Sequence, residues 1–297
     1  MATRAINPIR YEASKMRKTS EMNYKMDAAG GLAAPCEHPA ATLRLGHLYP
    51  DQLNVYGDRG NILTFQRRCA WRGIALEIAP IGASDQLDPA AYDLLFIGGG
   101  QDREQEDIAR DLRERKGPAL RAAVEAGVPL LAVCGGYQLL ARFYRPAEGP
   151  ELQGAAIFDA WTIHPGKRVA RCVGNVALRW NETTLIGFEN HGGRTYLGAN
   201  ARPLGAVLSG FGNNGEDAHE GCVVHNAYGT YLHGSLLPKN PHLADHLLAL
   251  ALARRYGASE AARLLPPLDD TLEWQAHDAM LHRVGVSPTT PRRLPIP

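Results

Sequence analysis

The sequence predicts an α/β fold: a mostly parallel central sheet flanked by helices, with extra short strands in the second half of its 297 residues. Short apolar segments alternate with helix-like segments through the first half, which is typical of parallel strands covered on both faces. Two of those apolar segments end on Gly98–Gly100 and on Cys134. Because ligands of such sheets bind beyond the carboxyl ends of the strands, we expect the functional site at these two turns.

The first half can be divided into elements by its apolar spacing and its glycines. Leu43, Leu45 and Leu48 predict a first strand, and Gly73 marks the end of the helix that follows it. Gly127 ends the longest amphipathic segment. The expected elements are a strand at 42–48, a helix at 58–72, strands at 74–78 and 93–97, a helix at 104–126 and a strand at 128–133.

The second half is richer in short strands and closes with a helix. We expect strands around 155–163, 169–179, 184–189, 205–210 and 221–224, and an apolar helix at 241–256. The domain organisation expected is a poorly ordered N-terminal extension at 1–41, one domain at 42–256 and a peripheral proline-rich extension at 257–297. Residues 270–283 within the last segment have the composition of one further helix.

Composition excludes several classes of function. With 32 basic and 31 acidic residues, no bulk charge favours nucleic acid or an anionic membrane. No window holds the run of apolar residues that a membrane span needs, and the N-terminus lacks a secretory signal. The five cysteines are widely spaced without a CxxC pair, which indicates a reducing cytoplasm and neither a disulfide framework nor a metal site.

Cys134 stands where a buried strand is expected to turn into a helix. Residues 130–133 are apolar, Gly135 and Gly136 follow, and helix-compatible residues resume. A helix N-terminus lowers the pKa of a thiol, and a glycine after it lets a backbone N–H point at a developing oxyanion. The pattern predicts a nucleophile. The alternative is a buried structural cysteine that ends a core strand.

His233 is the best candidate for the base that a cysteine nucleophile needs. It is expected to end a short strand and is followed by Gly234, so its side chain should lie over the same sheet edge as Cys134. Taken singly, it would be a histidine capping a strand in a surface loop.

Gly98–Gly100 lacks dinucleotide-binding spacing, and the sequence has no phosphate-binding loop. At the end of the neighbouring strand, that turn can aim a second backbone N–H at the oxyanion.

Several strings of residues carry a family resemblance that covers roughly 42–255. Three of them together resemble the class I glutamine amidotransferases, in the cobyric-acid-synthase-like branch: Phe96–Gln101, Val133–Gln138 and Tyr231–Gly234. Three more resemble the GatD-type glutaminase subunits of lipid II isoglutaminyl synthases: Leu53–Asn61, Gly187–Thr195 and Gly212–Asn214. The resemblance implies a flavodoxin-like arrangement of the predicted parallel sheet.

The resemblance implies a role for each residue of the two turns. Cys134 would attack the side-chain amide carbon of glutamine, form a γ-glutamyl thioester and release ammonia. His233 would take the thiol proton, pass it to the leaving ammonia and later activate water. The N–H groups of Gly135 and of the Gly99–Gly100 turn would hold the oxyanion.

The resemblance also implies residues for substrate binding. Arg168 lines up with the family's substrate-binding arginine and would pair with the α-carboxylate of glutamine. Judged by itself, an arginine in such a basic run is more often a solvated surface residue. Asn190, His191 and Arg194 would line the glutamine pocket or its rim, unless that polar segment is a plain structural turn.

One position departs from the family pattern. Many class I members carry a glutamate two residues after the histidine, where this sequence has Ser235. Either the enzyme works as a dyad or an orienting carboxylate comes from elsewhere. In the GatD-type branch the pattern suggests an aspartate of the partner subunit. We therefore expect weak glutaminase activity from this chain alone and stronger activity in the complex.

The resemblance implies a partner for the other half of the reaction. No cofactor is expected in this chain; ATP and Mg are expected on a Mur-ligase-like (MurT-type) synthetase subunit. That subunit would amidate the α-carboxylate of D-glutamate in the lipid II stem peptide to D-isoglutamine, in the cytoplasm at the inner face of the membrane. The alternatives are another acceptor such as a corrinoid carboxylate, a stand-alone γ-glutamyl cysteine hydrolase, and a non-catalytic binding module.

Overall fold

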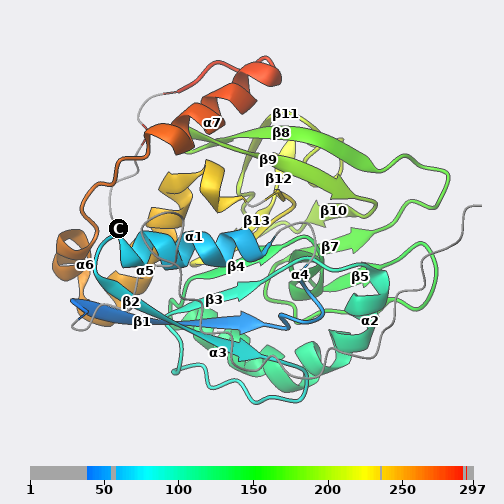
Figure 1. The fold of residues 1–297 in the computed structure, drawn as a ribbon. Coiled ribbons are helices and arrows are strands. Elements are labelled where there is room, and N and C mark those ends of the chain that lie inside the picture. Colours follow the sequence, from blue (N-terminus) through cyan, green and yellow to red (C-terminus); the bar gives the residue numbers. More distant parts are fainter. Residues whose placement is uncertain (1–38, 55–57, 235, 290–291, 293–297) are drawn as a thin grey trace, which may run out of the picture. The chain divides into compact units, whose positions relative to one another are not determined.

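The computed structural model describes residues 39–54, 58–234, 236–289 and 292. The expected N-terminal extension lies outside the described residues except for its last three, and the first strand begins at Ala41. A six-stranded sheet forms the centre, in the order β13–β14–β4–β3–β1–β2 (Figure 1). Its strands are β1 (Ala41–Leu48), β2 (Ile74–Ile81), β3 (Leu94–Ile97), β4 (Leu130–Val133), β13 (Cys222–Val224) and β14 (Ala227–Thr230).

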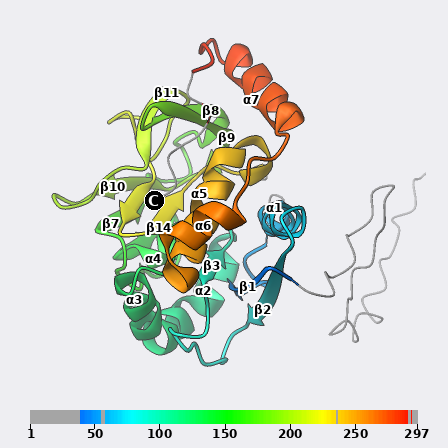
Figure 2. The same cartoon turned by 90° about the vertical axis from the view of Figure 1, so that its left-hand side faces the viewer.

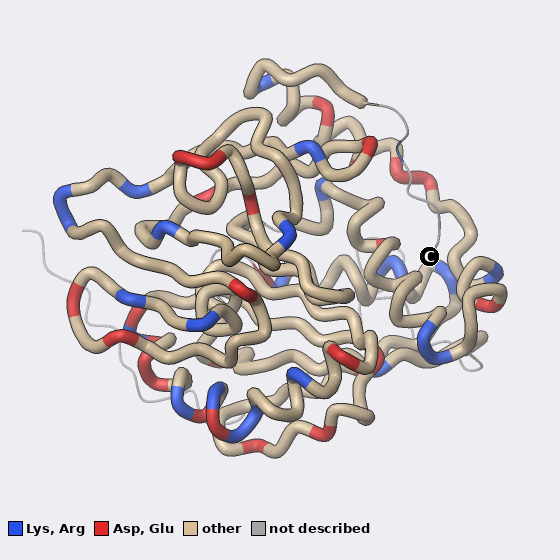
Figure 3. Tube along the Cα trace, turned by 180° about the vertical axis from the view of Figure 1, so that it is seen from behind, with Lys and Arg blue, Asp and Glu red and all other residues tan. Residues whose placement is uncertain are grey.

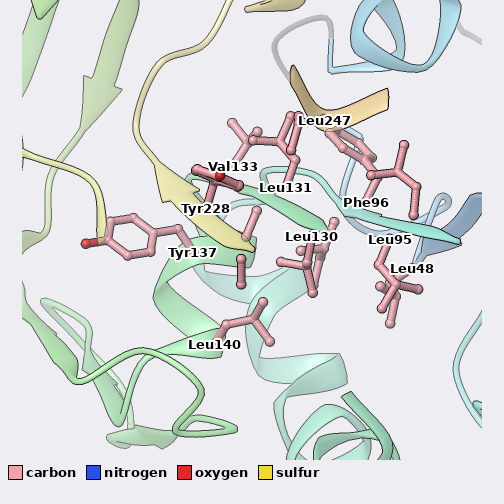
Figure 4. Close-up of a cluster of buried hydrophobic side chains, with 14 of the residues drawn as sticks. Leu48, Leu95, Phe96, Leu130, Leu131, Val133, Tyr137, Leu140, Tyr228 and Leu247 are labelled. Atoms are coloured by element: carbon pink, nitrogen blue, oxygen red, sulfur yellow. The ribbon is translucent and has the colours of Figure 1, made fainter. Parts of the chain in front are cut away.

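The central sheet has the mostly parallel character that the sequence predicts. Strands β2, β1, β3, β4 and β14 run parallel, and only the edge strand β13 is antiparallel to its neighbour. All residues of β3 and β4 are buried, which explains why both strands are apolar throughout instead of alternating. Their side chains pack with those of neighbouring elements, including Leu48, Tyr228 and Leu247 (Figure 4). The fold class is therefore α/β, as predicted.

Helices cover both faces of this sheet. Helix α1 (Arg59–Ala70) and helix α5 (Pro241–Tyr256) lie on one face, and α2 (Asp102–Asp111) and α3 (Gly117–Glu125) lie on the other (Figure 1). The helix predicted at 104–126 is thus two α-helices, joined by a π-helical turn at Leu112–Lys116. The buried ammonium of Lys116 bonds to Asp111, five residues earlier, which suits the wider π-helical turn.

Two smaller sheets are built from the strands between β4 and β13. One has the order β10–β7–β5–β6 and the other β12–β11–β8–β9. Their strands are β5 (Phe143–Arg145), β6 (Leu152–Gln153), β7 (Ala160–Ile163), β8 (Cys172–Trp180), β9 (Thr183–His191), β10 (Arg194–Leu197), β11 (Gly205–Ser209) and β12 (His219–Glu220). The long hairpin of β8 and β9 reaches over the carboxyl end of the central sheet (Figure 1).

The C-terminal segment is helical where the structure describes it. Helix α6 (Ala258–Leu264) follows α5, and α7 (Thr271–Arg283) forms where one helix is expected (Figure 2). The buried guanidinium of Arg68 on α1 pairs with Asp245 on α5 and with Asp270 before α7, at 2.6 Å each. This double ion pair ties the start of α7 to the central domain.

The surface carries charges of both signs. Figure 3 shows basic and acidic residues interspersed over the side opposite to that of Figure 1. This distribution agrees with the balanced composition. Among the described helices, none is long and apolar enough to cross a bilayer.

Candidate active site

Cys134 lies at a tight corner between β4 and the short helix α4 (Gly135–Leu140). Its φ of 48° and ψ of −106° are unusual for a residue with a side chain. The corner packs closely against Gly98–Gly100, the turn that follows β3. A methyl group added at Gly136 would lie 2.8 Å from the carbonyl oxygen of Gly98. One added at Gly135 would lie 2.8 Å from the nitrogen of Gly100. The strained backbone and the glycines together fix the direction of the thiol.

His233 is held by backbone pairing with β9. The structure ends β14 at Thr230, so the histidine lies three residues beyond the strand and not at its end as expected. Its N–H donates to the carbonyl of Phe188 at 2.8 Å, and the N–H of Phe188 donates back at 3.3 Å. These two hydrogen bonds fix the backbone of a side chain that is only 1% exposed.

The structure brings the thiol and the imidazole together at Gly99. A methyl group added at Gly99 would lie 3.1 Å from Cε1 of His233 and 3.2 Å from Cβ of Cys134. Both side chains therefore face the same glycine, over the same edge of the sheet. Cys134 is 6% exposed, so the pair is nearly closed off from bulk water.

The surroundings of His233 favour its charged form. Burial lowers the pKa of the imidazole, but the negative charge and hydrogen bond of Cys134 and those of Asp58 outweigh it and raise the pKa to about 10. A proton held on the imidazole beside a thiolate is the activated state of a cysteine nucleophile.

Asp58 is the functional candidate that the sequence reasoning missed. It lies directly before α1 and is fully buried, with Oδ1 3.7 Å from Nδ1 of His233. Its Oδ2 accepts the N–H of Gly99 at 2.6 Å. The sequence analysis leaves open a dyad or a carboxylate from elsewhere, which the resemblance places on the partner subunit; within this chain, Asp58 is a carboxylate beside the imidazole. Ser235 lies outside the described residues.

The hydrogen bond from Gly99 to Asp58 reduces the number of predicted donors for the oxyanion. Gly99 was one of three predicted donors, but its N–H already donates to the carboxylate of Asp58. The N–H groups of Gly100 and Gly135 remain as the candidate donors. The two glycines lie close together, since a methyl group added at Gly135 would lie 2.8 Å from the nitrogen and 2.9 Å from the oxygen of Gly100.

A cavity of about 550 Å³ opens beside Cys134. Its lining includes the candidate residues Asn190 and His191, together with Asp102, Glu104 and Arg171. The ring of His191 stacks on that of Tyr231, with centroids 3.7 Å apart. Asn190 accepts a hydrogen bond from Nε of Arg171 at 3.1 Å. Both acidic and basic groups therefore face a space large enough for a free amino acid.

Arg168 is placed differently from the expectation. It lies exposed in the loop between β7 and β8 and is not among the residues that line the cavity. Arg171, three residues later in the same loop, does line it. Arg194 braces this loop, because its guanidinium donates to the carbonyls of Gly192 at 3.1 Å and Ala170 at 2.7 Å.

A buried hydrogen-bond chain supports the cavity wall behind Cys134. Nε2 of Gln105 donates to Oε1 of Gln138 at 3.0 Å, and Nε2 of Gln138 donates to the hydroxyl of Tyr231 at 3.0 Å. That hydroxyl also bonds to the hydroxyl of Thr195 at 2.6 Å. These hydrogen bonds link α2, α4 and the segment leading to His233, so they fix these elements relative to one another.

Glu220 is a fully buried carboxyl group behind this wall, and it predicts a pH effect on stability. Burial raises its pKa to about 8, against hydrogen bonds from the Tyr231 N–H and the Thr230 hydroxyl that lower it. Between pH 4.5 and 8 the folded chain thus keeps a proton that the unfolded chain has released, and stability falls as pH rises.

Replacing Glu220 by Gln should remove this pH dependence. The free energy of unfolding of the wild type should fall by about 3 kcal/mol more than that of the variant between about pH 5 and pH 8. Urea unfolding at both pH values measures the difference. Parallel pH dependence in the two proteins would contradict the buried protonated carboxyl.

Comparisons with known proteins show which family the chain matches and which proteins are similar to it. The model of the CobB/CobQ-like glutamine amidotransferase domain matches residues 44–241. The chain is 38% identical over 244 residues to subunit GatD of lipid II isoglutaminyl synthase (glutamine-hydrolyzing) from Staphylococcus aureus, covering 82% of this chain and 96% of that protein. The same subunit from Streptococcus pneumoniae is 38% identical over 233 residues, covering 77% and 87%. A cobyric acid synthase from Pelotomaculum thermopropionicum is 35% identical over 182 residues, covering 57% of this chain but 34% of that protein.

Proposed function

Because the chain belongs to the CobB/CobQ-like glutamine amidotransferase family, we propose that it is the glutamine-hydrolysing subunit of a lipid II isoglutaminyl synthase. The observation that carries the proposal is the meeting of Cys134 and His233 at Gly99, beside a cavity of amino-acid size. The similarity to two GatD subunits over most of their length supports the choice of complex.

The proposed chemistry uses the thiolate and imidazolium described above. Sγ of Cys134 attacks the side-chain amide carbon of glutamine, and the oxyanion that forms is held by the N–H groups of Gly100 and Gly135. His233 gives its proton to the amide nitrogen, the C–N bond breaks and ammonia leaves. Water then attacks the γ-glutamyl thioester as His233 takes its proton, the C–S bond breaks, and the release of glutamate restores the thiolate–imidazolium pair.

Ammonia transfer to a carboxylate requires a second active site. The acceptor carboxylate must first be activated, and the sequence contains no phosphate-binding loop. We propose that a Mur-ligase-like, MurT-type synthetase subunit binds ATP and Mg and amidates the α-carboxylate of D-glutamate in lipid II. Since that acceptor is lipid-linked, the complex would work in the cytoplasm at the inner face of the membrane. Direct transfer keeps ammonia from being protonated in bulk water.

The similarity to a cobyric acid synthase favours one alternative, amidation of a corrinoid carboxylate. The two proposals differ in the partner: Mur-ligase-like for lipid II and dethiobiotin-synthetase-like for the corrinoid. A stand-alone γ-glutamyl hydrolase would need neither partner.

Purification of the tagged chain from its native host tests the proposal. We expect a Mur-ligase-like protein to co-purify, and the complex to amidate lipid II with glutamine and ATP. Glutaminase activity should be weak in the chain alone and stronger in the complex. A dethiobiotin-synthetase-like partner, or equal glutaminase rates with and without the partner, would contradict it.

The loop at 164–171 supplies the cations that we propose for the α-carboxylate of glutamine. Arg171→Ala should raise KM for glutamine about tenfold with kcat little changed, because it removes the guanidinium of the cavity wall. We keep Arg168 as a second proposed ligand, from the family resemblance, and expect a similar KM increase for Arg168→Ala. Lys167→Ala is the control, since its ammonium pairs with Glu148 on the surface. Steady-state ammonia release measures all three, and an unchanged KM in either arginine variant removes that arginine from the site.

A further inference from the structure

We propose that Glu104 binds the α-ammonium group of glutamine, so that the site selects its substrate by a free α-amino group. The inference rests on the proposed function and deepens it. The α-carboxylate of glutamine has proposed ligands in the loop at 164–171, whereas the α-ammonium has none. Glu104 would determine substrate specificity and take no part in the proton transfers.

The cavity that we propose for glutamine has acidic and basic groups on different elements. Asp102 and Glu104 come from the first turn of α2, whereas His164 and Arg171 come from the loop before β8. A methyl group added at Gly192 would lie 2.5 Å from Nε2 of His164 and 3.2 Å from Nη1 of Arg171, so these two side chains meet at one place in the wall. An amino acid whose carboxylate pairs with Arg171 can therefore turn its ammonium toward α2.

The length of glutamine places its ammonium near the glycine turn after β3. Four bonds separate the α-nitrogen from the side-chain amide carbon, so these two atoms lie at most about 5 Å apart. In the proposed reaction the amide carbon lies beside Sγ of Cys134 and the candidate oxyanion donor Gly100. Glu104 starts from the same place, since its Cβ would lie 3.5 Å from a methyl group added at Gly100. Its carboxylate is therefore within reach of the ammonium.

Glu104 has a carboxylate oxygen that is available to a ligand. Within the described part of the chain, no group donates a hydrogen bond to Oε2 of Glu104, although that atom is shielded from solvent. The amide of the neighbouring Gln105 donates elsewhere, to Oε1 of Gln138 at 3.0 Å and to the carbonyl of Gly100 at 3.3 Å. A shielded carboxylate oxygen without a donor is unfavourable, and an ammonium that donates to it removes this cost.

Asp102, the other acidic residue of the cavity wall, is already engaged. Its Oδ1 accepts a hydrogen bond from the hydroxyl of Tyr144 at 2.7 Å. Its charge also acts on His164: burial lowers the pKa of that imidazole, and Asp102 opposes the shift. Asp102 is exposed whereas Glu104 is half-buried, so water weakens the attraction of Asp102 for an ammonium more strongly. These differences favour Glu104 as the ligand.

A substrate without the α-amino group tests the proposal. Glutaramate is glutamine without that group, and it keeps both the side-chain amide and the carboxylate. Ammonia release by the chain in complex with its synthetase partner gives kcat/KM for the two substrates. The wild type should prefer glutamine at least about tenfold. Glu104→Gln keeps the shape and loses the charge, so kcat/KM should fall about 30-fold for glutamine and less than about threefold for glutaramate.

Three further variants locate the effect at one carboxylate. Glu104→Asp keeps the charge on a shorter side chain, and its preference for glutamine should lie between those of the wild type and Glu104→Gln. Asp102→Asn should keep the wild-type preference. Glu106→Gln is the matched control, because Glu106 is exposed on the same helix and is not among the residues that line the cavity. Its kcat/KM for both substrates should not change.

The outcomes distinguish this inference from the proposed function. A wild type that hydrolyses both substrates equally well, or a preference for glutamine that survives in Glu104→Gln, would overturn the role of Glu104. An equal loss of activity toward the two substrates in that variant would also overturn it, because it shows a structural effect. The same holds if Asp102→Asn loses the preference and Glu104→Gln keeps it. A wild-type complex that releases ammonia from neither substrate would instead contradict the proposed function.

Discussion

Replacement of Cys134 by Ser is expected to reduce glutamine-dependent amidation by at least about 10³-fold and to leave amidation with ammonium salts intact. A serine hydroxyl is far less acidic than a thiol, so His233 and Asp58 cannot hold it as the anion that attacks the amide. The synthetase reaction needs only ammonia, whichever source supplies it. Parallel assays of the reconstituted complex, with glutamine or with ammonium chloride, measure both activities.

Cys172→Ser is the matched control for this variant. Cys172 is a second buried free thiol, at the start of β8. Its replacement should leave both activities unchanged. Glutamine-dependent activity that survives in Cys134→Ser would show that another group splits the amide, and loss of ammonium-dependent activity would show a structural effect on the complex.

Replacement of His233 by Asn is expected to lower kcat for glutamine by about 10³-fold, with a KM close to that of the wild type. The reason is that the variant loses both the cation that stabilises the thiolate and the proton donor for the leaving ammonia. Residues other than His233 line the cavity that we propose for glutamine, so binding should persist. Single-turnover ammonia release separates the chemical step from binding.

His246→Gln serves as the control for a buried histidine. His246 on α5 bonds to the hydroxyl of Tyr228 at 2.8 Å, away from the thiol. Its replacement should lower stability and leave kcat unchanged. A His233→Asn variant with wild-type kcat, or with a loss confined to KM, would contradict the role of His233 as proton carrier.

The sequence was sufficient to predict the core of this fold because local signals agree there. The apolar run of β3 is followed by Gly98–Gly100 and that of β4 by Cys134 and two glycines, and short runs of this kind are typical of buried parallel strands. The turn residues after them could therefore be placed at one edge of the sheet. The π-helical turn at 112–116 was not predictable, since it depends on the buried contact between Lys116 and Asp111.

Cys134 and His233 could both be named from the sequence, but only the position of Cys134 follows directly from a strand. Cys134 follows β4 directly, whereas His233 is set by its pairing with Phe188, a contact that leaves no local sequence signal. Asp58 looked like the first residue of a helix, and its approach to His233 depends on the packing of α1 beside the β3 turn. Arg168 lies in a loop whose path no periodicity describes.

The most direct test of the central claim is the mass of the protein during turnover. Acid quenching of the chain with glutamine, followed by intact and peptide mass spectrometry, should detect one γ-glutamyl group on the peptide that contains Cys134. The adduct should disappear on treatment with hydroxylamine, as a thioester does, and should be absent from Cys134→Ser. Ammonia release at the full rate, with the modification on another residue or on none, would contradict the claim that Cys134 is the nucleophile.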